Sequence, residues 1–539
     1  MRGITLAIAL LLAAGLAFRL APLADLGERM LWQWPTEDGY LMMTIARNIA
    51  LGHGMTISAG EIPTNGTQPL ATLVWAGIFW LAAGDRVTGV LLIQLAQIAI
   101  GGAGALGLYF LGRRLLADRP WGAPGAALAA ALWFASPVVI THLMNGLETG
   151  VSLALIIWSV LAWSTWRQQA SAQVRVAGAA GIGVLLGLTF LARIDAVFLI
   201  IALTGWHAAL GLADSGRGFR ARTVESFAMG AASMVVASPW LIYNYIGFGS
   251  IMPISGTSQS TDAALASNLG AVPVALFRYI TQVFPVPVAA SDHMVVAFAA
   301  ALACLAYFAV VGAALRRASG EARAVALVVA TMGLGLCLYY GLFFGARYFI
   351  ARYMAPWSPF LALATTALVL AALDRLGGAR ARTLAALGVC AATLVLAIGL
   401  NVRIYVAVGR GSAVEHRHVL RWVESNVRAE AWVGAVQTGV LGFFHDRTIN
   451  LDGKVNPYAL AARLEGRIPH YVVATPIEYI ADWHGVSEWI ELEPLSKHFE
   501  LAVADRKANL AVLKRMSALP ANADIRGGLE IHGRPRDAR

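Results

Sequence analysis

Runs of apolar residues long enough to cross a lipid bilayer recur along most of this 539-residue chain. A spanning helix needs about 20 such residues to cross a hydrocarbon core of about 30 Å. Eleven runs approach this length, near residues 4–22, 87–110, 123–140, 150–166, 177–191, 196–212, 226–246, 294–315, 322–341, 356–373 and 383–402. Charged residues make up 13% of the chain, against roughly 25% in soluble domains. The sequence therefore predicts a polytopic α-helical membrane protein and excludes a soluble enzyme, a disordered chain and a fibrous repeat.

The first run admits two interpretations. Arg2, followed by an apolar stretch and small residues, is typical of a cleaved signal peptide. The apolar stretch continues past Arg19 to Leu26, however, with few small residues along it. We therefore expect this run to remain as a membrane helix.

Residues 69–84 are apolar but only sixteen residues long, so the chain has twelve spans if this segment crosses the membrane and eleven if it does not. The positions of the arginines decide between these two topologies. If this segment does not span and the N-terminus is cytoplasmic, fifteen arginines fall in the short cytoplasmic pieces and seven in the outer loops before residue 403. Cytoplasmic loops carry the excess of Lys and Arg in membrane proteins. If the segment did span from the same start, almost all of the fifteen would lie outside. The sequence therefore predicts eleven spans in the cytoplasmic (inner) membrane and a C-terminus on the outer side.

Three outer regions follow from this topology. The transmembrane domain covers residues 1–405 and carries a first outer loop at 23–86 and a second large outer loop at 247–293. The C-terminal region, 406–539, contains sixteen of the thirty-one acidic residues and all four lysines. Strand-like segments alternate there with helix-like ones such as Glu415–Val427. The expected strands are Trp432–Val436, Thr448–Leu451, Tyr471–Ala474 and Leu510–Leu513. We expect an extracytoplasmic α/β domain.

Adjacent carboxylates, Glu37 and Asp38, follow the first span and precede an amphipathic segment at about 40–51. At a membrane surface, one carboxylate can act as a general base while its neighbour tunes the proton affinity. The alternative is a solvated loop in which Asp38 caps the following helix. Glu148 opens a later span, where it is either a functional acid or a helix N-terminal charge.

Arginines at two other outer positions are candidates for binding an anion. Arg347 and Arg352, each followed by a tyrosine, are five residues apart at a membrane edge, and the planar guanidinium group suits a phosphate. The alternative for this set is packing at the membrane interface. Arg193 and Asp195 lie between two spans with no room for a long loop, which favours a local ion pair.

Several classes of site have no pattern in this sequence. A glycine-rich phosphate loop with Lys is absent, which argues against an ATP-driven pump. Paired broken helices at matching positions are absent too, which weakens a secondary transporter. The three cysteines lie inside apolar runs, and zinc-type His/Cys spacing is missing. The arginines mark topology, so no nucleic-acid partner is expected, and neither is a nucleotide cofactor. Two carboxylates, Asp38 and Glu148, are too few to assert a divalent cation, which stays open.

The outer motifs, taken in order, resemble those of bacterial GT-C glycosyltransferases. These multi-spanning enzymes use polyprenyl-phosphate sugars and are related to protein mannosyltransferases, aminoarabinose transferases and mycobacterial arabinofuranosyltransferases. The matching blocks are Glu37-Asp38-Gly39-Tyr40, Ala46-Arg47-Asn48-Ile49-Ala50, Gly52-His53-Gly54, Thr64-Asn65-Gly66-Thr67-Gln68-Pro69-Leu70, Asn145-Gly146-Leu147-Glu148-Thr149, Leu191-Ala192-Arg193-Ile194-Asp195, Gly439-Val440-Leu441-Gly442-Phe443-Phe444 and Asn450-Leu451-Asp452-Gly453-Lys454-Val455-Asn456. Together they extend over nearly the whole chain.

The resemblance implies a site and a reaction. It assigns the base to Asp38, with Glu37 as the less favoured candidate, and a second acidic residue near the active site to Glu148. We expect the donor phosphate to bind Arg352 and Arg347, with Tyr353 and, more weakly, Arg193. Other substrate contacts are expected from Tyr40, Arg47, Asn65, Gln68 and Asp195.

The function expected from these patterns is transfer of a sugar from a polyprenyl-phosphate donor to a hydroxyl of a lipid, a cell-envelope glycan or a protein. The acceptor would be met at the outer face of the cytoplasmic membrane. Two alternatives stay open. A transporter or flippase of lipid-linked sugars would move its substrate without a covalent product, and a non-catalytic assembly protein would depend on residues 406–539 alone.

Overall fold

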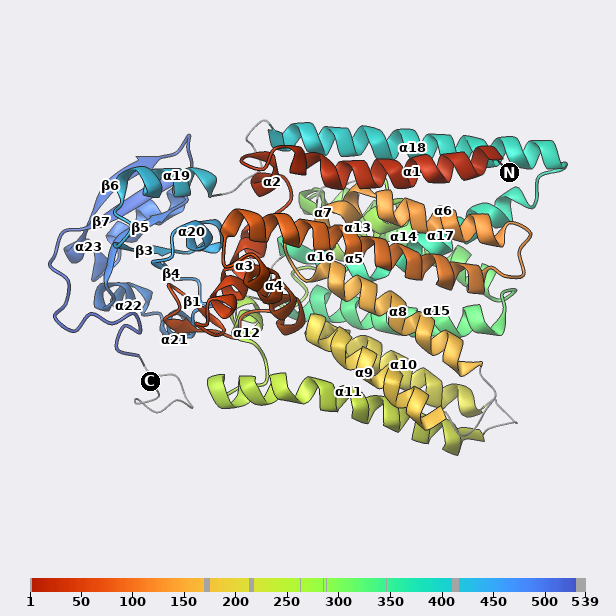
Figure 1. Ribbon diagram of the computed structural model, residues 1–539, viewed down its shortest axis with the longest axis horizontal. Helices are drawn as coiled ribbons and strands as arrows, with labels where there is room; N and C mark the ends of the chain where they lie inside the picture. The colour runs from red at the N-terminus through yellow and green to blue at the C-terminus, as the bar shows by residue number, and fades with distance from the viewer. Residues whose placement is uncertain are drawn as a thin grey trace.

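The computed structural model describes residues 2–168, 175–212, 218–261, 263–284, 286, 288–345, 347–409 and 416–529. Glu415, the first residue of one expected helix, lies outside these residues, as do 410–414 and the last ten residues of the expected C-terminal region. Figure 1 shows long helices side by side in one part of the molecule and a small sheet with short helices at the other end.

The long helices account for the expected spans. They are α1 (Arg2–Leu20), α5 (Arg86–Leu115), α8 (Thr149–Arg167), α9 (Arg175–Ala192), α10 (Val197–Ala209), α11 (Gly218–Phe248), α14 (Met294–Leu315), α15 (Gly320–Leu338), α17 (Ser358–Leu373) and α18 (Ala379–Gly409). Within the described ranges, ten helical segments are long and apolar enough to cross a membrane. The bent pair α6 (Gly122–Ala135) and α7 (Pro137–Leu143), which meet at a 60° bend just before Pro137, brings the number to eleven when the pair is counted as one span.

The ambiguous segment 69–84 forms a short helix, α4 (Pro69–Leu81), of 13 residues. At 1.5 Å per residue it is about 20 Å long, well short of a hydrocarbon core. The predicted architecture, about eleven spanning helices followed by a C-terminal α/β region, is confirmed.

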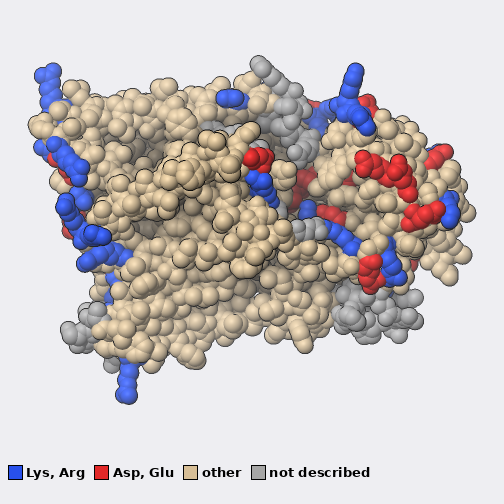
Figure 2. Space-filling model, turned by 180° about the vertical axis from the view of Figure 1, so that it is seen from behind, with Lys and Arg blue, Asp and Glu red and all other residues tan. Residues whose placement is uncertain are grey.

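The surface of the helical part is largely apolar. Val295 on α14 is 77% exposed and Phe227 on α11 is 76% exposed, which suits contact with lipid rather than water. In Figure 2, Lys and Arg side chains gather at the end of the helical part away from the sheet, whereas Asp and Glu are frequent over the sheet end. Arg113 and Arg114 in the last turn of α5 and Arg167 in the last turn of α8 belong to the arginine-rich end.

The first loop, expected on the outer side, folds into α2 (Arg29–Trp32), α3 (Glu37–Ala50), the short antiparallel pair β1 (Thr56–Ile57) and β2 (Ile62–Pro63), and then α4. Helix α3 begins at Glu37 because the Thr36 hydroxyl accepts a hydrogen bond from the Gly39 N–H at 3.2 Å. Thr36 is therefore the capping residue, which corrects the alternative in which Asp38 caps this helix. Asp38 lies inside the first turn, where a negative charge is favourable.

The C-terminal region contains a five-stranded mixed sheet in the order β4-β3-β5-β7-β6. The strands are β3 (Trp432–Ala435), β4 (Thr448–Asn450), β5 (Ile477–Asp482), β6 (Phe499–Asp505) and β7 (Leu510–Arg515). Strand β3 runs parallel to β4 and β5, and β7 runs antiparallel to β5 and β6. The expected strand Tyr471–Ala474 is wrong, because these residues end the helix α22 (Ile468–Ala474). Short apolar runs fit a buried strand and a buried helix equally well.

Helices flank the sheet at α19 (Arg417–Asn426), α20 (Gly439–Phe444), α21 (Pro457–Leu464) and α23 (Leu495–His498). Helix α20 packs on α3, and one buried apolar cluster joins the first loop to the sheet through Tyr40, Phe79, Phe443 and Val512. Burial of this cluster holds the C-terminal region on the first outer loop. The first loop and the C-terminal region therefore meet at one end of the helical part (Figure 1).

Candidate active site

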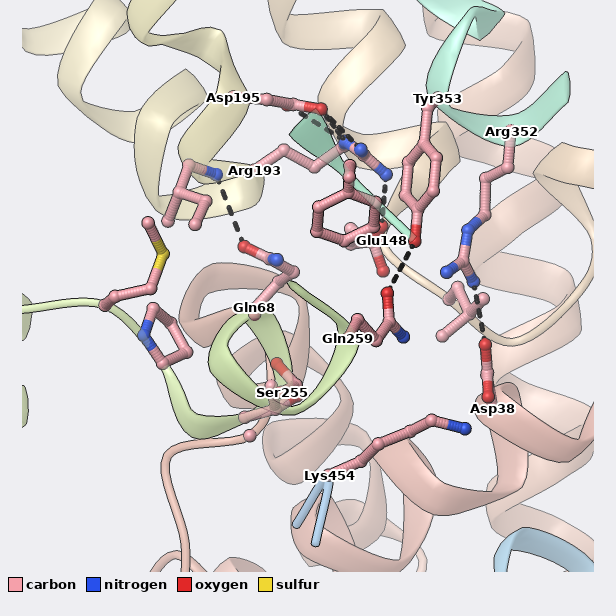
Figure 3. A pocket seen from close by; sticks show the side chains of 18 of the residues that line it. Asp38, Gln68, Glu148, Arg193, Asp195, Ser255, Gln259, Arg352, Tyr353 and Lys454 are labelled. Atoms are coloured by element: carbon pink, nitrogen blue, oxygen red, sulfur yellow. Dashed lines mark hydrogen bonds and ion pairs between the residues drawn. The ribbon is translucent and has the colours of Figure 1, made fainter. Parts of the chain in front are cut away.

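A cavity of about 250 Å³ lies where the first loop, the helical part and the C-terminal region meet. It is lined by segments that are far apart in the sequence, as Figure 3 shows. Its polar lining consists of Asp38, Thr67, Gln68, Glu148, Arg193, Asp195, Ser255, Gln259, Tyr339, Tyr340, Arg352, Tyr353 and Lys454. Apolar residues such as Phe198, Met252 and Phe344 complete the wall. Polar groups that converge in a largely apolar cavity are typical of a ligand site.

Asp38 and Arg352 face each other in this cavity. Arg352 belongs to the short helix α16 (Ile350–Tyr353), and its Nη1 donates to Asp38 Oδ2 at 3.3 Å. Side-chain exposure is 21% for Asp38 and 12% for Arg352. The Nε of Arg352 is buried and has no hydrogen-bond partner among the described residues. A buried donor without a partner is costly, so Arg352 retains capacity to bind an anionic ligand.

Tyr353 joins the next part of the wall. Its ring stacks on Tyr340 with centroids 4.1 Å apart, and its hydroxyl donates to Gln259 Oε1 at 3.2 Å. Gln259 lies on α12 (Ile254–Ser260), within the expected second outer loop. Tyr353 therefore connects the helical part to this loop at the cavity.

Arg193 is the centre of a buried ion network. Its Nη1 donates to Glu148 Oε1 at 2.8 Å, and its Nε donates to Asp195 Oδ1 at 3.1 Å. The Tyr340 hydroxyl donates to Asp195 Oδ2 at 2.7 Å. Arg193 thus forms the local ion pair that its spacing favoured, and its donors are mostly taken by two carboxylates. It lines the cavity but has less capacity for a phosphate than Arg352.

Glu37 lies outside this cavity, which corrects its candidacy as the base. Its carboxylate accepts hydrogen bonds from the backbone N–H groups of Gly439 and Val440 at the start of α20, the second at 3.0 Å. Burial raises the pKa of Glu37 to about 7, against the lowering effect of His416 and of these two backbone donors. Both carboxylate oxygens are occupied, so Glu37 attaches the first loop to the C-terminal region.

Arg347 also lies outside the cavity, which corrects its expected place beside Arg352. It donates to Ser291 Oγ at 3.0 Å and pairs with Asp292 at 2.7 Å. Five residues exceed one helical turn by about 1.4 residues, so two side chains with this spacing project in different directions. Only Arg352 of the pair faces Asp38.

Three other expected substrate contacts are structural. Tyr40 is fully buried, and its hydroxyl donates to the Leu31 carbonyl at 2.6 Å. Arg47 donates to the Gly84 carbonyl at 2.8 Å and pairs with Asp446 at 3.2 Å. Asn65 is buried, and its carbonyl accepts the Ile254 N–H at 3.1 Å. These contacts correct the expectation of substrate binding, because the three side chains brace the loops around the cavity.

Gln68 and Asp195, from which substrate contacts are predicted, line the cavity. The Ile194 N–H donates to Gln68 Oε1 at 3.4 Å, which links the first loop to the 193–195 turn. Five more of the predicted site residues line the same cavity: Asp38, Glu148, Arg193, Arg352 and Tyr353.

Lys454, Gln259 and Tyr340 are among the lining residues that were not anticipated as site residues. Lys454 belongs to a block that the family resemblance singles out, so a signal for it was present. Gln259 lies in a Pro-, Ser- and Thr-rich loop, and Tyr340 lies in an apolar run. Nothing in their local sequence separates these two residues from ordinary loop or span residues.

A metal site was left open by the sequence. Among the residues that the structure describes, no group of three or more His, Cys, Asp or Glu side chains is placed to hold a metal ion.

Known proteins match parts of this chain in sequence. A family described as a domain of unknown function (DUF8728) matches residues 404–515. A terminal beta-(1->2)-arabinofuranosyltransferase of Mycobacterium tuberculosis is 26% identical over 231 residues, which are 40% of this chain and 36% of the relative. The match therefore spans little more than a third of that relative's length.

Solved structures match nearly the whole chain. ArnT from Cupriavidus metallidurans bound to undecaprenyl phosphate superposes with a TM-score of 0.58 at 14% identity, over 95% of this chain and 98% of ArnT. The oligosaccharyltransferase AglB of Archaeoglobus fulgidus, in complex with an inhibitory peptide and a dolichol-phosphate, superposes with a TM-score of 0.51 at 13% identity, over 96% of this chain and 75% of AglB. Helical part, outer loops and C-terminal sheet are all included, so this chain has the GT-C fold that the ordered motifs of its sequence predicted.

Proposed function

We propose that this protein is a membrane glycosyltransferase that moves a sugar from a polyprenyl-phosphate donor to a hydroxyl of a lipid, a cell-envelope glycan or a protein. The reaction takes place at the outer face of the cytoplasmic membrane, with the N-terminus in the cytoplasm and the C-terminal region outside. The observation that carries this proposal is the meeting of Asp38 and Arg352 across one cavity, 3.3 Å apart, from segments 314 residues apart in sequence. A carboxylate and a cation with spare donors are the two groups that such a transfer needs.

Two solved structures of the same fold support the donor class, because ArnT was solved with undecaprenyl phosphate and AglB with a dolichol-phosphate. The relative from Mycobacterium tuberculosis is an arabinofuranosyltransferase, which supports the reaction class. The transferred sugar is a pentose or a hexose. A lipid-linked donor also suits the outer side of the membrane, where nucleotide sugars are not available.

The chemistry is a single displacement. The carboxylate of Asp38 accepts the proton of the acceptor hydroxyl as that oxygen bonds to the anomeric carbon. The bond from the anomeric carbon to the phosphate oxygen breaks, and its electron pair leaves with the polyprenyl phosphate. Because the leaving phosphate gains negative charge, the guanidinium group of Arg352 stabilises it more strongly than it stabilises the donor.

The remaining polar residues position these groups. Glu148 and Asp195 hold Arg193 in place, and Arg193 and Arg352 each lie over the ring of Tyr353, 5.3 Å and 5.4 Å from its centroid. Arg193 is proposed as a positioning residue with a secondary role at the phosphate. The apolar wall near Phe198 and Met252 offers a surface for the polyprenyl chain.

The experiment is Asp38→Asn in the purified protein, assayed with a radiolabelled polyprenyl-phosphate sugar and a membrane extract as acceptor. We expect transfer to fall by about 10²–10⁴-fold, the usual contribution of a general base. Glu61→Gln removes an exposed carboxylate of the same loop and should transfer at the wild-type rate. If Asp38→Asn transfers as well as Glu61→Gln, Asp38 is not the base. Unchanged thermal melting of both variants shows that the loss is not one of folding.

A further inference from the structure

Lys454 extends from the C-terminal region into the cavity. It follows β4, and Figure 3 shows its ammonium group directed toward Asp38. The side chain is 21% exposed, and its Nζ pairs with Asp452 Oδ2 at 3.0 Å. Burial lowers the pKa of Lys454, but Asp452 and Asp38 raise it more, so the net pKa is above its ordinary value. Lys454 therefore carries its positive charge at neutral pH.

The backbone around Lys454 is fixed by contacts from several directions. Asp452 Oδ1 accepts the Lys454 N–H at 2.8 Å, and the turn between them uses Gly453 at a φ of 78°. The carbonyl of Asp452 accepts hydrogen bonds from Ser258 Oγ at 3.1 Å and Arg463 Nη1 at 3.0 Å. These contacts come from the second large loop and from α21.

The first loop packs closely against the same turn. A Cβ added at Gly66 would lie 2.1 Å from the Lys454 carbonyl oxygen, so only glycine permits this approach. Lys454 is therefore held by the first loop, the second loop and the sheet together. A flexible side chain on so fixed a backbone places its ammonium group within a small volume.

The charges in the cavity divide into two groups. Arg193 is paired with two carboxylates, Glu148 and Asp195, so this side has no positive charge to spare. On the other side, Arg352 and Lys454 flank Asp38. An ammonium group has three donors, and among the described residues Nζ of Lys454 contacts one partner, Asp452. Two donors of Lys454 thus remain for a ligand.

We propose that Lys454 is a second cation of the phosphate subsite, supplied by the C-terminal region to act with Arg352. The ligand is the phosphate of a polyprenyl phosphate, so the inference rests on the proposed function. A sugar-bearing polyprenyl phosphate carries one negative charge, and the released polyprenyl phosphate carries up to two. A cation beside the leaving group therefore stabilises the phosphate most strongly in the transition state, as the bond breaks. The C-terminal region then completes the active site rather than merely covering it.

The test compares two lipids that differ only in the phosphate. Binding of undecaprenyl phosphate and of undecaprenol is measured in detergent micelles for the wild type, Lys454→Ala and Lys454→Arg. Loss of one charge-assisted hydrogen bond should raise the Kd of Lys454→Ala for undecaprenyl phosphate by about tenfold. Its affinity for undecaprenol should stay unchanged. Lys454→Arg keeps the charge and should recover most of the affinity.

Lys497→Ala is the matched control, because Lys497 is a 72% exposed lysine of the same region and should bind as the wild type does. Equal affinity of Lys454→Ala and the wild type for undecaprenyl phosphate would overturn the proposal. So would an equal loss of affinity for both lipids, which would indicate a structural role. Inorganic phosphate at the same concentration should not displace the lipid, and displacement would argue for free phosphate as the ligand instead.

These outcomes are separate from failure of the proposed function. If the wild type does not distinguish undecaprenyl phosphate from undecaprenol, the phosphate subsite itself is wrong. If the wild type distinguishes the two lipids and Lys454→Ala does so equally well, only the role of Lys454 is wrong. In the transfer assay, Lys454→Ala should lower kcat by a larger factor than it raises KM for the donor.

Discussion

Two adjacent carboxylates at the start of α3 have different surroundings, although the sequence presents them as a pair. Successive residues of an α-helix project about 100° apart. Asp38 consequently lies in the cavity against Arg352, and Glu37 lies against the backbone of α20. Spacing alone predicted a pair at one site. The helix geometry instead directs Asp38 into the cavity and Glu37 against the C-terminal region.

Glu37 makes the attachment of the C-terminal region pH-dependent. Its pKa is about 7 in the folded protein against 4.5 as the ordinary value, chiefly because of burial. The folded state therefore binds more protons than the unfolded state between these values, and stability falls as pH rises through this window. Glu37→Gln cannot titrate. We expect the difference in melting temperature, wild type minus Glu37→Gln, to decrease as the pH is raised from about 4.5 to about 7 and to stay constant above that.

The measurement is tryptophan-fluorescence melting of both proteins in the same detergent across this pH range. Subtracting the variant removes the contribution of groups that titrate in both proteins. A difference that rises with pH would show that the ionised carboxylate is the favoured form in the folded protein. The two backbone donors would then outweigh the cost of burial.

At the scale of elements, the contact between α3 and α20 depends on glycine. A Cβ added at Gly439 would lie 1.8 Å from the Glu37 carbonyl oxygen, whereas one added at Gly442, on the same helix, would meet its nearest neighbour at 3.8 Å. Gly439→Ala should destabilise the protein by about 1–3 kcal/mol through overpacking. It should also reduce transfer, because Lys454 is carried by the displaced region.

Gly442→Ala is the control within the same short helix. It fits without a clash and gains helix propensity, so its melting temperature should equal or slightly exceed that of the wild type. Thermal melting of the two variants side by side separates a close approach from a general effect of alanine. Equal melting temperatures would show that α20 is not packed as closely on α3 as the structure has it.

The elements themselves were largely predictable, since spans are set by length and hydropathy. The short helix α4 could be recognised because sixteen apolar residues and the arginine distribution both argued against a span. The sequence analysis misses strands β5 and β6 and misassigns Tyr471–Ala474, because short runs of this kind carry no clear periodicity. Sequence distance predicts Arg347 beside Arg352, but the short helical segments Arg347–Phe349 and Ile350–Tyr353 direct their side chains apart.

At the scale of the whole molecule, the cavity is assembled from parts that sequence order cannot bring together. Asp38 comes from the first loop, Gln259 from the second and Lys454 from the C-terminal region. The family resemblance indicated which blocks matter, but only packing shows which side chains within a block face the same space. Tyr40, Arg47 and Asn65 lie within these blocks and support the walls instead.

We predict that the cavity and the C-terminal region lie on the outer side of the membrane. Because Glu37 is bound to α20, the C-terminal region and Asp38 form one body and must lie on the same side. Lys507 is exposed in that region, and Arg316 is exposed at the C-terminal end of α14. A membrane-impermeant maleimide should label Lys507→Cys in intact spheroplasts and Arg316→Cys only after permeabilisation. Of the native thiols, Cys304 and Cys390 are buried and Cys337 is partly buried, so the labelling of the unsubstituted protein is subtracted as background. The reverse labelling would place Asp38 in the cytoplasm, where the positive-inside distribution and an outward-facing transfer would both be wrong.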